Sequence, residues 1–260
     1  MEAALAQSWA KFKHYVKHYE RFFDFGEQDE TRGAMLAPIA GLLAELDVLV
    51  QAGEVLWRAR RDPGRAIPDD RLEEAMGPAP VQKASHSRMS PQGISYMYLS
   101  DGPETCIAEI RPAAGEIVCL GRFRVIRDLR VVDLSGVNPR KRGDEARAAR
   151  FLASFAREIS RPLTPQDALL DYIPTQVLSE FIRSRGYDGI KYRSSQFESG
   201  FNYTLFCGPK TADSPADTRV IDPFVHWMRL EHLERKRVCS LAFVLQDVDE
   251  QATLPLSAAR

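Results

Sequence analysis

Five polar residues near the ends of short apolar segments have side chains that could carry chemistry. They are Arg58 in LWRAR, Arg88 in SHSRMS, Tyr98 in SYMYLS, Glu109 in IAEIRP and Ser194 in YRSS. Arginine grips phosphate oxygens with two charge-assisted hydrogen bonds, a carboxylate stabilises developing positive charge, and hydroxyl groups donate hydrogen bonds. Each residue also has an ordinary structural explanation, because strand arginines are mostly solvated and a lone serine is common in turns. Taken singly, none of the five defines a site.

The segments around these residues predict a mixed α+β domain. Apolar alternation predicts strands in EVLWRAR (54–60), ISYMYLS (94–100), EIVCLGRFRV (116–125), RDLRVVDLS (127–135), YDGIKY (187–192), YTLFCG (203–208) and RVCSLAFVLQ (237–246). Helices are expected over 101–112, where Pro103 fits the first turn, over 143–160, and over 173–186, where Gly186 ends the helix. Because the strands outnumber the helices and are interrupted irregularly, the pattern favours α+β over a doubly wound sheet.

The first 53 residues differ from the rest of the chain in the spacing of their apolar residues. One apolar stripe with steps of three and four runs from Trp9 to Phe23, and a second runs from Leu36 to Leu49, which predicts two helices. We therefore divide the chain into a helical N-terminal module, residues 1–53, and a second domain, residues 54–260. Within the second domain, residues 61–93 are rich in Pro, Gly and charge, which indicates a functional loop or a partly disordered segment.

The composition argues against several classes of function. The formal net charge of −1 gives no general affinity for nucleic acid or an anionic membrane. No apolar run approaches the roughly 18 residues of a spanning helix, and the first residues lack the apolar core of a secretory signal. The four cysteines are scattered without a C-x-x-C pair, so we expect no zinc or other metal site. These points favour a cytoplasmic protein.

Taken together, the five residues and their surroundings resemble the RES family, named for an arginine, a glutamate and a serine. The resemblance runs from LWRAR through RMSPQGISYMYLSDGPETCIAEIRP and LRVVDLS to TQVLSEFIRSRGYDGIKYRSSQFESGFNYTLF, most of residues 54–208. The N-terminal helices resemble the HEPN/RES-type helical extension of one branch of the family. The resemblance implies a fold similar to ADP-ribosyltransferases, with a split, mostly antiparallel β core around an NAD⁺ cleft. It also implies an enzyme that degrades NAD⁺ at the nicotinamide bond, by hydrolysis or phosphorolysis, and typically a toxin of a bacterial toxin–antitoxin pair.

The family's functional positions carry over one residue at a time. Those implied to be catalytic are Arg58, Tyr98, Glu109 and Ser194. Arg88 matches a second arginine that usually follows glycine, whereas Ser87 precedes it here. Since glycine permits backbone angles that serine resists, this departure bears on the conformation of the loop.

The implied reaction suits these residue types. Nicotinamide leaves as a neutral group, and positive charge grows on the ribose, where Glu109 would stabilise it. Arg58 and Arg88 would hold the pyrophosphate. Tyr98 would offer a flat face to the nicotinamide ring, and Ser194 would donate a hydrogen bond to the ribose or the phosphate.

Three further residues are candidates for substrate binding. Ser195 is the alternative to its neighbour for the serine role. Arg60 is the alternative to Arg58, because side chains two apart share one face of a strand. Asn202 either supports the serine loop or is an ordinary structural amide.

Two other functions remain open at this point. A mono-ADP-ribosyltransferase would share the cleft and pass the ribosyl group to a protein, and a non-enzymatic binding module would keep only the shape of the cleft. The expected partners are NAD⁺, as substrate and not as cofactor, and a cognate antitoxin protein. The sequence leaves open the choice between water and phosphate as acceptor, the role of residues 1–53 and the formation of homo-oligomers.

Overall fold

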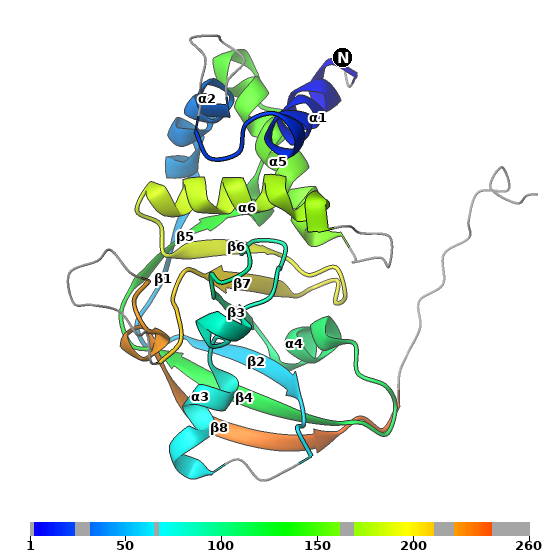
Figure 1. The fold of residues 1–260 in the computed structure, drawn as a ribbon, viewed down its shortest axis with the longest axis vertical. Helices are drawn as coiled ribbons and strands as arrows, with labels where there is room; N and C mark the ends of the chain where they lie inside the picture. The colour runs from blue at the N-terminus through cyan, green and yellow to red at the C-terminus, as the bar shows by residue number, and fades with distance from the viewer. Residues whose placement is uncertain (1–2, 24–31, 65–67, 162–168, 211–220, 241–260) are drawn as a thin grey trace, which may run out of the picture.

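The computed structural model describes residues 3–23, 32–64, 68–161, 169–210 and 221–240, in which one sheet is accompanied by helices (Figure 1). The strands within these ranges are β1 (Asp47–Val50), β2 (Val55–Arg61), β3 (Met97–Ser100), β4 (Ile117–Val125), β5 (Leu129–Asp133), β6 (Gly189–Arg193), β7 (Phe201–Leu205) and β8 (Met228–Arg237). The α-helices there are α1 (Ala3–His18), α2 (Arg32–Glu45), α3 (Leu72–Met76), α4 (Pro103–Ile110), α5 (Ala146–Ser160) and α6 (Leu169–Ser184).

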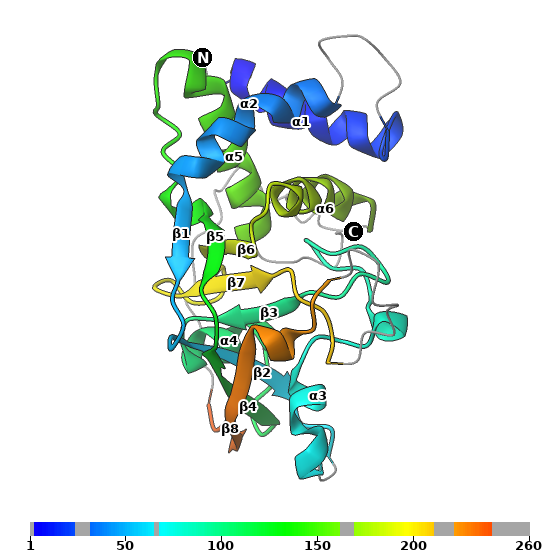
Figure 2. The same cartoon turned by 90° about the vertical axis from the view of Figure 1, so that its left-hand side faces the viewer.

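The sheet is mixed but mostly antiparallel. Its strand order is β1-β5-β6-β7-β3-β2-β4-β8, and among these strands only β5 and β6 run parallel. Helices α1, α2, α5 and α6 gather at one end of the molecule, next to β5 and β6, whereas α3 and α4 accompany β2, β4 and β8 at the other end (Figures 1 and 2). The predicted α+β class with a mostly antiparallel core is confirmed.

The helical end is stabilised by a large apolar core. On α5, Phe151 and Phe155 recur at helical spacing and are both buried. The ring centroid of Phe151 lies 5.1 Å from that of Trp9 and 5.2 Å from that of Phe12, and both partners are on α1. The predicted N-terminal helices therefore pack against the helices of the second domain.

The predicted second helix is wrong at its C-terminal end. Helix α2 ends at Glu45, and Asp47–Val50 is strand β1, which pairs with β5 at the edge of the sheet. The apolar spacing of Leu46 and Leu49 continues the helical stripe, but two β-branched valines in DVLV fit a strand better. Strand β1 precedes residue 53 and yet belongs to the sheet of the second domain.

The last described strand was not predicted from the sequence. Strand β8 covers Met228–Arg237 and pairs with β4, whereas the predicted strand 237–246 lies mostly outside the described residues. The segment MRLEHLERKR was not predicted as a strand because an edge strand leaves many charged side chains in water. In the part of the chain that the structure describes, no helix is long and apolar enough to cross a membrane.

Candidate active site

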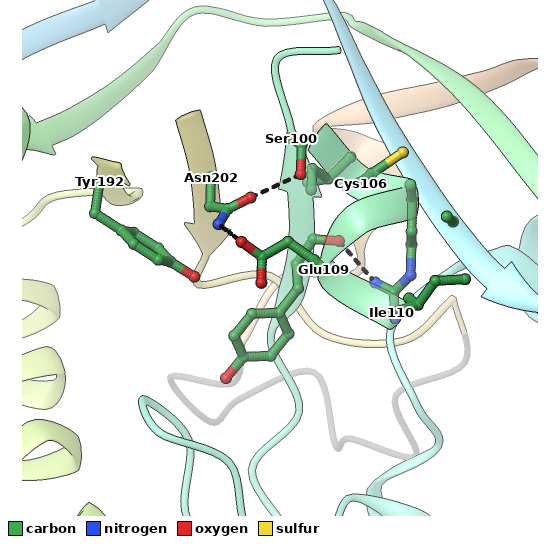
Figure 3. Close-up of a pocket in the computed structure, with 10 residues that line it drawn as sticks. Ser100, Cys106, Glu109, Ile110, Tyr192 and Asn202 are labelled. Atoms are coloured by element: carbon green, nitrogen blue, oxygen red, sulfur yellow. Dashed lines mark hydrogen bonds between the residues drawn. The ribbon is translucent and has the colours of Figure 1, made fainter. Parts of the chain in front are cut away.

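The sheet is almost interrupted between β2 and β3. Strand β2 pairs with β4 from Val55 to Arg61, but it pairs with β3 only at Trp57 and Ser100. Strands that share a single pair separate beyond it, and a hollow of 230 Å³ opens at this junction. It is lined by Arg58, Ala59, Tyr98, Leu99, Ser100, Cys106, Glu109, Ile110, Tyr192 and Asn202 (Figure 3).

Helix α4 carries Glu109 to this hollow. The helix has Pro103 at its start, and it stops at Arg111, whose left-handed φ of 45° ends the helical turn. Cys106 is buried in a small core with Ala59 of β2. Because residues three apart share a helix face, Glu109 lies on the same side as Cys106, at the rim of that core.

One oxygen of the Glu109 carboxylate is held by two donors. Glu109 Oε1 accepts a hydrogen bond of 2.6 Å from Ser194 Oγ and another of 2.6 Å from Asn202 Nδ2. No described residue donates to Oε2, and the second oxygen points away from Asn202 (Figure 3). The carboxylate is thus anchored through one oxygen, and the other oxygen is available to a substrate.

Ser194 begins a tight loop between β6 and β7. Its Oγ accepts hydrogen bonds of 3.1 Å from the backbone N–H groups of Gln196 and Phe197, and its own N–H donates to Gly200 O at 2.9 Å. A side chain at Gly200 would meet Thr105 of α4 at 2.3 Å, so this position requires glycine. The Ser194 hydroxyl has one proton, and in this structure it is directed to Glu109 and not into the hollow.

Arg58 spans the gap between the separated strands. Its Nη1 donates to Tyr98 O at 3.3 Å and lies 3.0 Å from Met97 Sδ. Removal of water by the surrounding protein, followed by the positive charge of Arg60, lowers the pKa of Arg58 to about 9. Among the residues described, no carboxylate forms an ion pair with Arg58. The hollow therefore contains a guanidinium that forms no ion pair with any described residue, although the Glu109 carboxylate lines the same hollow.

Tyr98 is held by a loop that is hydrogen-bonded to helix α6. The Tyr98 hydroxyl is hydrogen-bonded to Ser87 and, at 3.0 Å, to Ser90 Oγ. Gln176 of α6 donates to Ser87 O at 2.8 Å. Burial raises the pKa of Tyr98 above its usual value, against the effect of the two serine hydrogen bonds. Ser87 does not have a positive φ, so the serine that replaces the expected glycine adopts an ordinary backbone conformation.

Comparisons with known proteins identify the family of this chain. The model of the RES domain matches residues 55–226. The chain belongs to the RES domain family. A chain in the crystal structure of the M. tuberculosis MbcT–MbcA toxin–antitoxin complex is similar at 14% identity and a TM-score of 0.41, over 77% of this chain and 92% of that chain. No curated protein matches the sequence.

Two of the predicted binding residues of the RES domain do not line the hollow. Arg88 Nη1 donates to Ile159 O, at the end of α5, at 2.6 Å. Ser195 accepts a hydrogen bond of 2.8 Å from Gln196 Nε2 within the serine loop. Arg88 belongs to the loop that holds the lining residue Tyr98. Ser195 follows Ser194, which does not line the hollow but contacts the lining residue Glu109.

Arg60 lies in another part of the RES domain. Its guanidinium donates to Ala75 O at 2.7 Å and to Gly77 O at 2.6 Å, and it lines a separate hollow of 660 Å³ next to α3. Arg60 and Arg58 share a strand face as predicted, but α3 covers the strand at Arg60. The sequence could not show this, because the position of α3 depends on tertiary packing.

Neither Tyr192 nor Ser100 was identified from the sequence as a site residue, but both line the hollow between β2 and β3. Tyr192 lies on β6 two residues before Ser194, and burial raises its pKa above the usual value for tyrosine. Its side chain is directed to the same space as the Glu109 carboxylate (Figure 3). Alternation along the strand could have identified Tyr192, whereas Ser100 depends on a register between β3 and β7 that no local pattern reveals.

Metal ligands do not gather in the described part of the RES domain. No cluster of three or more His, Cys, Asp or Glu side chains there could hold a metal ion. The groups that converge on the hollow are a carboxylate, a guanidinium, two phenols, an amide and a serine hydroxyl. Such a set can bind and polarise a substrate by charge and hydrogen bonding.

Proposed function

We propose that this protein is an enzyme that degrades NAD⁺ by cleaving the bond between nicotinamide and ribose. The observation that carries the proposal is the Glu109 carboxylate in a RES-domain hollow, with Oε1 held by Ser194 and Asn202 and with Oε2 unengaged by any described donor. A carboxylate fixed in this way is prepared to stabilise positive charge without first reorganising.

The proposed reaction needs charge stabilisation more than proton transfer. The C1′–N bond breaks, and its electron pair moves to the pyridinium nitrogen, so nicotinamide leaves as a neutral molecule. The ribose carbon becomes positively charged, as in glycoside cleavage. Glu109 Oε2 stabilises this cation or accepts a hydrogen bond from a ribose hydroxyl. An oxygen of the acceptor, water or phosphate, then forms a bond to C1′, and the proton that water loses passes to solvent.

The other lining residues supply binding groups for the substrate. The charge of Arg58 lacks an anionic partner among the described residues, and a pyrophosphate oxygen would provide one. Tyr98 and Tyr192 both line the hollow, and aromatic rings offer flat surfaces on which a nicotinamide ring can stack. These roles favour a dinucleotide over a smaller glycoside.

We further propose that the protein acts as a toxin. An enzyme that destroys NAD⁺ harms the cell that makes it unless a partner restrains it. We therefore expect a cognate antitoxin protein that blocks access to the hollow. Expression without that partner should lower cellular NAD⁺, and a stable NAD⁺ pool would contradict the toxin function.

Incubation of the purified protein with NAD⁺, with and without phosphate, tests the enzymatic function. We expect release of free nicotinamide. ADP-ribose as co-product identifies water as the acceptor, and ADP-ribose 1″-phosphate that forms only with phosphate identifies phosphorolysis. Label that becomes attached to protein would instead indicate an ADP-ribosyltransferase. If the wild-type protein releases no more nicotinamide than a Glu109→Gln variant purified in parallel, the proposal is wrong.

A further inference from the structure

Ser100 and Asn202 form a buried polar pair behind the Glu109 carboxylate. They face each other across β3 and β7, and they are 3% and 5% exposed. Ser100 Oγ donates to Asn202 Oδ1 at 2.8 Å, and Asn202 Nδ2 donates to Glu109 Oε1 at 2.6 Å (Figure 3). Three side chains from two strands and a helix thus form one continuous hydrogen-bonded chain that ends at the carboxylate.

The chemistry of the three groups sets the direction of this chain. An ionised carboxylate only accepts hydrogen bonds, so the NH₂ group of Asn202 must face Glu109. The amide oxygen of Asn202 is then turned toward Ser100, and the Ser100 hydroxyl must be the donor. If Ser100 loses its hydroxyl, a buried amide oxygen loses its partner and the Asn202 side chain loses one of its two restraints.

Two donors from different elements restrain Glu109 better than one. Ser194 reaches Oε1 from the loop after β6, and Asn202 reaches the same oxygen from β7. A single hydrogen bond would leave the carboxylate free to swing about Oε1, whereas two converging bonds restrict that motion. The orientation of Oε2 therefore depends on Asn202 and, through it, on Ser100.

We propose that Ser100 and Asn202 are positioning residues that hold Oε1 of Glu109, so that only Oε2 is presented to the ribose. This inference rests on the proposed function. Neither residue needs to touch the reacting atoms. Their effect is on the geometry of Glu109, and small displacements of a reacting group have large effects on rate.

The first test compares two equally buried serines. Ser100→Ala removes the donor to Asn202, and Ser179→Ala is the matched control, because Ser179 is 0% exposed and donates a 2.8 Å hydrogen bond to Thr175 O in α6. We expect Ser100→Ala to lower kcat for NAD⁺ cleavage by about 10- to 100-fold with little change in KM. Ser179→Ala should leave kcat unchanged, and thermal melting of both variants checks that each is folded at the assay temperature.

The second test exchanges the donor for an acceptor of the same shape. Asn202→Asp places a second carboxylate next to Glu109, and repulsion between the two raises the pKa of the pair, so that both are ionised only in alkaline buffer. We expect kcat to fall by about 100-fold in mildly alkaline buffer and to recover partly as the pH is lowered, because the introduced carboxyl group can again donate once it is protonated. A loss of kcat that is the same at every pH would contradict a positioning role.

Crystal structures of the wild-type and Ser100→Ala proteins separate this inference from the proposed function. If the wild-type protein is inactive on NAD⁺ but the carboxylate of Glu109 rotates in Ser100→Ala, the proposed function is wrong and the positioning role stands. If the wild-type protein is active and Ser100→Ala keeps both its kcat and the orientation of Glu109, the positioning role is wrong. An inactive wild-type protein with an unmoved Glu109 overturns both, and a rotated Glu109 with unchanged kcat overturns the positioning role.

Discussion

Strand β2 contributes to two hollows that differ in how the arginine from β2 is held. The hollow bordered by α4 has a volume of 230 Å³ and contains Arg58 and Glu109. The hollow bordered by α3 has a volume of 660 Å³ and contains Arg60. Arg60 donates to two backbone carbonyl groups, and its neighbour Arg61 forms an ion pair with Glu116.

In the smaller hollow the charges are only partly compensated. Glu109 uses one oxygen for Ser194 and Asn202 and leaves the other unengaged by described donors. Arg58 has a carbonyl and a thioether as neighbours but no carboxylate within the described residues. The comparison teaches that the larger cavity is not the better candidate for the active site. Charges that the fold orients without neutralising them mark the site that awaits a charged ligand.

The largest expected effect is a loss of kcat when Glu109, the carboxylate of the smaller hollow, is replaced, but not when Glu74, a carboxylate of the larger hollow, is replaced. Glu109→Gln keeps the shape of the side chain and removes the negative charge that stabilises the ribosyl cation, so we expect kcat for NAD⁺ cleavage to fall by at least about 10³-fold. Glu74→Gln, in the larger hollow, should leave kcat unchanged. Steady-state kinetics and thermal melting of both variants check this. Near-normal turnover of Glu109→Gln would refute the role of Glu109.

The two arginines should respond in opposite ways to the same substitution. Arg58→Met removes a partly buried charge that lacks an anionic partner, so we expect loss of NAD⁺ cleavage together with a rise in Tm of roughly 2–4 °C. Arg60→Met leaves two carbonyl groups without donors, so we expect a loss of about 2 kcal/mol of stability and little change in kcat. Denaturant unfolding and steady-state kinetics of the two variants test this opposite response of stability and kcat. A lower Tm in Arg58→Met would contradict the prediction.

A pH dependence should follow from Arg58. Its pKa of about 9 lies below the ordinary value of 12.5, so the folded protein binds fewer protons at this residue between the two values, and its contribution to stability rises with pH across that interval. Binding of the pyrophosphate needs the protonated form. We expect KM for NAD⁺ to rise as the pH passes about 9, after subtraction of the uncatalysed rate.

Arg60→Met sharpens this measurement, because the positive charge of Arg60 is the second cause of the lowered pKa of Arg58. Without that charge, the alkaline rise in KM should move to higher pH. An unchanged pH profile in Arg60→Met would show that the two guanidinium groups do not interact along β2.

The smallest expected effect concerns the loop that holds Tyr98. Ser87→Gly restores the residue that usually precedes the second arginine in this family, but it removes a hydroxyl that contacts both Ser90, at 2.7 Å, and Tyr98. We expect a loss of about 1 kcal/mol of stability and a change in kcat of less than threefold. A larger loss of activity, measured alongside a Tyr98→Phe variant, would show that the hydroxyl of Tyr98 takes part in catalysis.

Local patterns predicted most of the elements that carry the site. Alternation identified β2 to β7, and helical spacing with Pro103 and Gly186 as boundary residues identified α4 and α6. The errors lie at the edges of the sheet. Strand β1 was not predicted because its leucines continue a helical pattern, and β8 was not predicted because it carries many charged side chains. Both are edge strands, which are paired on one side only, so their sequences are less constrained.

The candidate site was predictable as residue types but not as contacts. Arg58, Tyr98, Glu109 and Asn202 line one hollow, and Ser194 contacts it through Glu109. Their catalytic roles remain predictions. Arg60 lies elsewhere although it has the same residue type and strand face as Arg58, because the positions of α3 and α4 around β2 decide which arginine is covered.

The sequence alone determined the chemical groups of this protein and the class of its fold, because side-chain types and strand and helix periodicity are local properties, and its motifs carried the resemblance to the family. Only the tertiary structure decided that a single oxygen of Glu109 accepts both hydrogen bonds and that Ser100 donates a hydrogen bond to Asn202. Those facts depend on the register between β3 and β7 and on the single pair that joins β2 to β3. Register and strand separation arise from the packing of segments far apart in the chain, so they have no signature in any one segment.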